Sequence, residues 1–90
     1  HAWGNHMLVL GDQVSGGKLY GAFPDLTLGG PTDVGDEGRW LPVTPVEKYA
    51  FTLARWMGIS NNQQPYVFPN AINFAAVGQT VMSALSFMKS

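Results

Sequence analysis

Apolar residues occur in short runs, and turn-forming residues separate these runs along most of the chain. Residues 7–10 (MLVL) are continuously apolar and precede Gly11, which is typical of a short buried strand. Gly16 and Gly17 stand between two segments of high β-propensity, and this pattern predicts a hairpin whose returning strand spans residues 18–20. The first quarter of the chain is therefore expected to contain short paired strands.

The strongest local pattern is TPVEKYAFTLARWMG, which predicts a helix over residues 45–57. Thr44 is a suitable N-cap, and Glu47 stands three residues later, where it would complete a capping box. Pro45 suits the first helical position, and Gly58 suits the residue just after the helix.

One face of this helix is expected to line the core because its apolar residues recur at helical spacing. Phe51 and Trp56 lie outside this stripe, so the helix is expected to be covered on more than one side. The residues of the stripe are Val46, Tyr49, Ala50, Leu53 and Met57.

The rest of the chain gives weaker signals. Residues 24–42 contain a turn former every few positions and no periodicity, so we expect a long loop that is functional or packs on a larger body. Residues 77–88 have helical apolar spacing, although Gly78 disfavours a helix there. The pattern as a whole predicts the α/β class, with short strands, a β-hairpin, one firm helix over residues 45–57 and a possible C-terminal helix.

Composition suggests that part of the surface is normally covered. Hydrophobic residues make up 46% of the chain and charged residues 12%, whereas ordinary domains carry about 25% charged residues. A net charge of −1 without a basic cluster gives no support for nucleic-acid binding. The absence of cysteine excludes disulfides and thiolate metal sites, and no apolar run is long enough to span a membrane.

His1 and His6 are the first candidates for chemistry, because imidazole is a common ligand of zinc and other divalent metals. Two histidines do not complete a site, and Asp12 could add a carboxylate. The alternative is that both are ordinary terminal and loop histidines.

Each of the other polar clusters also has both a functional and a purely structural interpretation. Asp33, Asp36 and Glu37 place oxygen ligands around glycines, as calcium loops do, but their spacing does not fit an EF-hand and suits a solvated turn. Arg39, followed by Trp40, could bind an anion or stack on a ring, or could simply anchor the loop. Ser15 and Thr44 are the candidate nucleophiles, but no nucleophile elbow or triad surrounds them.

Several segments match a known family together. HAWGNH, GGKLYG, LGGP, GRWLP, LARWMG and VFPN follow one another within residues 1–74. In this order they resemble the C-terminal part of a family of exported bacterial proteins of unknown function within the alkaline phosphatase and sulfatase superfamily. Its members usually carry a twin-arginine export signal, so the resemblance implies a periplasmic or secreted location. Residues 75–90 depart from the family's ending.

The resemblance implies that His1 corresponds to the histidine of an Asp-His metal-binding pair and that His6 lies near a further ligand position. It also implies that the nucleophile and the other metal ligands precede residue 1. Residues 1–90 are thus expected to form either a single small domain or the C-terminal part of a larger α/β domain, whose central sheet would carry helices on both faces.

Two functions follow as hypotheses. The first is the C-terminal portion of an exported phosphatase- or sulfatase-like hydrolase, inactive alone, that uses a divalent metal such as zinc or calcium. Its partner would be the N-terminal part of the same protein or another chain. The second is a non-enzymatic binding or assembly module, possibly oligomeric, that uses an apolar surface with the aromatic residues Trp3, Tyr20, Trp40 and Trp56.

Overall fold

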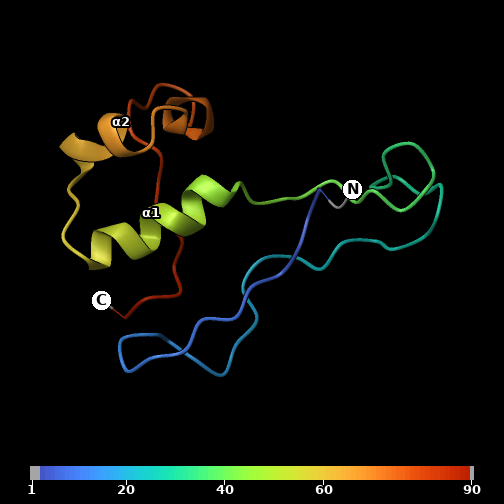
Figure 1. The fold of residues 1–90 in the computed structure, drawn as a ribbon, viewed down its shortest axis with the longest axis horizontal. Coiled ribbons are helices and arrows are strands. Elements are labelled where there is room, and N and C mark those ends of the chain that lie inside the picture. Colours follow the sequence, from blue (N-terminus) through green and yellow to red (C-terminus); the bar gives the residue numbers. More distant parts are fainter. Residues whose placement is uncertain (1–2, 90) are drawn as a thin grey trace.

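The computed structural model describes residues 3–89 and places its helices in the second half of the chain. Helix α1 (Val46–Trp56) is followed by a 3-10 turn (Asn61–Gln63), the short helix α2 (Gln64–Val67) and a second 3-10 turn (Ala71–Phe74). The chain before α1 runs as an extended loop that leaves the helical part and returns to it (Figure 1).

The predicted α/β class is wrong, because the described residues contain no sheet. Backbone pairing outside the helices is reduced to two isolated β-bridges, one between Val14 and Met88 and one between Asp33 and Trp40. The predicted alkaline-phosphatase-like arrangement of strands and hairpin is therefore not the fold of this chain.

Both predicted strands are irregular and exposed. Residues 7–10 form no strand, and Leu8 and Leu10 are 82% and 83% exposed because no sheet covers them. In residues 18–20, the Tyr20 hydroxyl donates to the Ser15 carbonyl oxygen at 2.6 Å, and this side-chain bond closes the turn in place of a ladder. The two-glycine pattern therefore marks a turn without a hairpin.

The predicted helix is present, but it begins one residue later and without the expected capping box. Pro45 is the N-cap in an extended conformation, and its carbonyl oxygen accepts the first helical bond from the Lys48 N–H at 3.1 Å. Thr44 consequently lies one position too early to cap. A capping box forms instead at Ser60, whose N–H donates to Gln63 Oε1 at 2.8 Å.

The buried face of α1 differs from the predicted stripe. Phe51 and Thr52 are buried, whereas Val46 and Met57 are 58% and 78% exposed. The Phe51 ring meets Phe68 edge-on, with ring centroids 5.9 Å apart. The core therefore forms around Phe51, the largest fully buried side chain of the helix, which the spacing rule had assigned to a second face.

The possible C-terminal helix is not formed, and side chains from the helices hold the irregular chain from Met82 onward in place. The buried Gln64 amide donates to the Met82 carbonyl oxygen at 2.9 Å and accepts from the Met82 N–H at 2.8 Å. Thr52 Oγ1 accepts from the Leu85 N–H at 2.8 Å. Gly78, with a φ of +81°, turns the chain before this segment.

The same C-terminal segment joins the N-terminal half to the helices. The Ser15 N–H donates to the Phe87 carbonyl oxygen at 2.8 Å, and the Lys89 N–H donates to the Gln13 carbonyl oxygen at 2.7 Å. The Phe87 ring lies 5.8 Å from the Tyr49 ring of α1. The buried apolar core is nevertheless small: Phe51, Ala71, Met82 and Phe87.

The molecule is expanded for its length. Its accessible surface is 6914 Å², whereas a compact monomer of this mass exposes about 5,100 Å². Its radius of gyration is 15.0 Å, against about 12 Å for a compact chain of this length. None of the helices within residues 3–89 has the length and hydropathy of a membrane-spanning segment.

Candidate functional site

The most ordered part of the N-terminal half is a loop built around the buried side chain of Asp33. One carboxylate oxygen accepts the N–H groups of Gly38 at 3.0 Å and Arg39 at 3.2 Å. The other accepts the Gly29 N–H at 3.0 Å. Because charge-assisted bonds to backbone N–H groups are strong, one carboxylate fixes both sides of the loop.

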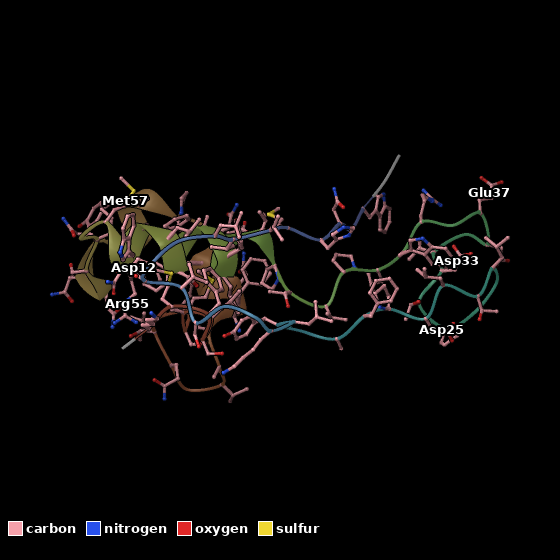
Figure 2. The ribbon with its side chains drawn as sticks, turned by 90° about the horizontal axis from the view of Figure 1, so that it is seen from below. Asp12, Asp25, Asp33, Glu37, Arg55 and Met57 are labelled. Carbon is pink, nitrogen blue, oxygen red and sulfur yellow. The ribbon has the colours of Figure 1, made fainter. Side chains whose placement is uncertain are left out.

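Further bonds close this loop, which we call the acidic loop (residues 25–41). The Leu41 N–H donates to the Thr32 carbonyl oxygen at 2.8 Å, and the Thr32 hydroxyl donates to the Asp25 carbonyl oxygen at 2.6 Å. The Thr27 hydroxyl and N–H hold the pKa of the Asp25 carboxyl below its ordinary value. The acidic loop is thus a closed unit, and it lies at one end of the molecule (Figure 2).

These contacts decide between the two interpretations of the acidic sequence. Asp33 is used by the backbone, while Asp36 and Glu37 are exposed at the tip of the loop. Within residues 3–89, no three His, Cys, Asp or Glu side chains come together as a metal-binding group. The loop is therefore better described as a turn stabilised by Asp33 than as a calcium loop.

Arg39 anchors the loop, as one of the two interpretations predicted. Its Nε donates to the Val34 carbonyl oxygen at 3.1 Å, and its guanidinium lies 5.1 Å from the centre of the Trp3 ring. A Cβ on Gly35 would lie 2.5 Å from the guanidinium nitrogen, so a larger residue would displace the Arg39 side chain. The φ of +86° at Gly35 also favours glycine. Trp40 is half-buried beside it.

Among residues 3–89, the candidate metal ligands and nucleophiles do not come together as a site. His1 lies outside the described residues. His6 is exposed, and its N–H donates to Asn5 Oδ1 at 2.9 Å. Asp12 is also exposed, and Ser15 serves in backbone pairing to the C-terminal segment. A single exposed histidine among the described residues does not make a metal site, because zinc needs three or four ligands.

The dominant surface feature is apolar. Of the aromatic residues that the sequence singled out, Trp3, Tyr20 and Trp56 are 50%, 41% and 61% exposed. The structure adds a larger aliphatic and aromatic set that the sequence reasoning assigned to strands or left unassigned. These added residues include Leu8, Leu10, Leu19, Phe23, Leu28, Tyr66 and Val77. The low fraction of charged residues was the sequence signal for this surface.

Comparison with known proteins finds no relative of this chain: no family model, no curated protein and no solved structure matches it. The resemblance to the exported phosphatase- and sulfatase-like family therefore stays a prediction.

Proposed function

We propose that this chain is a binding and assembly module whose apolar surface is covered by another polypeptide surface. The observation that carries the proposal is the exposed apolar surface of an expanded chain. The total accessible surface exceeds that of a compact monomer of this mass by about 1,800 Å², and many of the large apolar side chains are more than half exposed. Apolar surface exposed on this scale is typical of an interaction site.

The distribution of the exposed side chains supports the same function. Leu19 is 99% exposed, Leu10 is 83% exposed and Phe23 is 79% exposed, all in the half of the chain that lacks helices. Each large apolar side chain that leaves water contributes about 1.5–3 kcal/mol. Covering this half would supply free energy that the small core of Phe51, Ala71 and Met82 does not.

The test is the native mass of the purified chain, measured beside its denatured mass and its binding of an apolar dye. We expect a particle heavier than 9.7 kDa, or a monomer that binds the dye strongly. Replacing Leu19 and Phe23 by serine should reduce the association or the dye signal without changing the helix content. A 9.7 kDa monomer that binds no dye would contradict the proposal.

The second candidate function is a portion of a phosphatase- or sulfatase-like metallohydrolase. The observation that favours it is the exposed His6 imidazole on a segment that the Trp3–Arg39 stack fixes to the acidic loop. His6 would supply one ligand, and the others would come from the surface that covers this chain. The described residues alone do not fit a metal, so no catalytic step is assigned to them.

Titration with Co²⁺, followed by its absorption bands, tests this second candidate. We expect binding that is weakened at least tenfold by His6→Ala and less by Asp12→Asn. Equal affinity of the native chain and His6→Ala would exclude His6 as a ligand. The same titration of His1→Ala separates a contribution from the other predicted histidine.

A further inference from the structure

Acidic side chains are concentrated in the acidic loop. The acidic loop (residues 25–41) carries four carboxylates and one arginine, a net charge of −3. The rest of the chain carries four basic and two acidic side chains, a net charge of +2. Residues 48–90 contain no acidic residue at all.

The acidic loop and Arg55 lie far apart. The molecule measures 41 × 32 × 23 Å along its principal axes. Figure 2 shows Asp25, Asp33 and Glu37 at one end of the long axis and Arg55, at the end of α1, at the other. At the acidic end, Asp36 and Glu37 are exposed, and Arg55 is exposed at the opposite end.

Arg55 stands between two hollows in the surface. They have volumes of about 450 and 480 Å³, and both are lined by Arg55 and Asn61. The remaining lining residues are neutral, with hydroxyl and amide groups from Ser60, Asn62 and Ser83 among them. These hollows can therefore receive a carboxylate, because they offer one cation, several hydrogen-bond donors and no acid among their lining residues. Asp12 lies at the same end of the molecule but lines neither hollow (Figure 2).

We propose that the surface is covered by a second copy of this chain in an antiparallel arrangement, with Glu37 and Asp36 of each copy docked at Arg55 of the other. The inference rests on the proposed assembly function and names its partner. In a two-fold symmetric pair the same contact occurs twice, so each end of the molecule meets its complement. The exposed apolar side chains between the two ends are then buried together.

The surplus of accessible surface is large enough to form the interface of a dimer. If each copy lost its surplus of about 1,800 Å², the pair would bury about 3,600 Å² in total, within the range of obligate homodimers. Because opposite charges at the rim set orientation and association rate more than affinity, the apolar surface would hold the pair and the charges would fix its direction.

Sedimentation velocity of charge-exchange variants tests the pair. The native chain should sediment as a dimer of twice 9.7 kDa. Glu37→Arg and Arg55→Glu should each raise the dimer dissociation constant about tenfold, and combining them should restore it. Lys48→Glu, which changes the net charge as Arg55→Glu does and lies in α1, outside the covered half of the chain, is the matched control and should leave the dimer intact.

The outcomes separate this inference from the assembly function. A monomer that binds the apolar dye overturns the second copy as occupant while leaving the assembly function standing. A monomer that binds no dye overturns both. A dimer whose dissociation constant is unchanged in both single variants, or that the double variant does not restore, overturns the antiparallel docking.

Discussion

At the scale of single residues, three buried polar side chains hold separate backbone segments together through hydrogen bonds, as neighbouring strands do in a sheet. Asp33, Thr52 and Gln64 are each less than a tenth exposed, and each bonds backbone groups distant in sequence or across a loop. A buried donor or acceptor left without a partner costs about 1–3 kcal/mol. These positions are therefore expected to be sensitive to substitutions that preserve shape but remove an acceptor.

Asp33→Asn should open the acidic loop, because the amide nitrogen would face an N–H group where a carboxylate oxygen accepts now. We expect amide hydrogen exchange at Gly38 and Arg39 to accelerate roughly 30-fold, equivalent to about 2 kcal/mol. Asp36→Asn, at the exposed tip, is the control and should leave both amides protected. Unchanged exchange in Asp33→Asn would show that its carboxylate does not hold the loop.

The Asp25 carboxyl should titrate at a lower pH in the folded chain than in urea, because Thr27 donates to its ionised form. A lowered pKa stabilises the fold above the ordinary value of 3.8, and this contribution disappears as the pH falls through the folded pKa. Carboxyl NMR should show the midpoint rising in Thr27→Val, which removes the hydroxyl. An identical midpoint in both proteins would rule out the Thr27 hydroxyl as the cause.

At the scale of elements, α1 organises the second half of the chain through two different neighbours. Phe51 packs with Phe68, Ala71 and Met82, and Tyr49 meets Phe87. The Thr52 hydroxyl, which also donates to the Lys48 carbonyl oxygen at 2.6 Å, fixes the C-terminal segment to the helix through Leu85. The expectation that α1 is covered on more than one side is thus met: Phe51 lies outside the predicted stripe, and Tyr49 belongs to it.

Thr52→Val should lower the free energy of unfolding by about 1–3 kcal/mol, because the Leu85 N–H loses its acceptor while the side-chain volume is kept. Thr52→Ser retains the hydroxyl and is expected to cost less. Urea unfolding followed by circular dichroism measures both. Equal losses in the two variants would assign the effect to packing and not to the hydrogen bond.

At the scale of the whole molecule, a small helical core carries a long irregular segment. Residues 3–24 contain no helix, and their contacts with the rest of the chain include the two backbone bonds from Gln13 and Ser15 to the C-terminal segment. Ordering a residue costs about 1–2 kcal/mol of backbone entropy. Such a segment gains little to offset this cost until its apolar side chains are covered.

Hydrogen exchange should therefore depend on association. In the dissociated chain, the amides of residues 7–10 and 18–24 should exchange fast, while those of α1 stay protected. On association, protection of residues 7–10 should rise by at least tenfold. Fast exchange of these residues at every concentration at which the chain is associated would place the interface elsewhere.

Local signals predicted parts of the structure well. Residues 45–57 form a helix to within one residue at each end, because helix propensity and the signals of Pro45 at the start and Gly58 after the end act over a few neighbours. The predicted side-chain cap of Thr44 was wrong. The long loop over residues 24–42 was also predicted from its turn formers. The strands at residues 7–10 and 18–20 were wrong, because an apolar run indicates burial but does not supply the partner that a strand needs.

The sequence by itself determined the position of α1, the presence of a long loop over residues 24–42 and the shortage of charge, since each depends on neighbouring residues or on composition. Only the tertiary structure decided which face of α1 is buried, how Asp33 closes the acidic loop and that residues 82–89 form no helix. The first and last of those outcomes depend on hydrogen bonds of the Gln64 and Thr52 side chains with the backbone of Met82 and Leu85, respectively. These residues are 18 and 33 positions apart, and no local periodicity records a contact between side chain and backbone at such a separation.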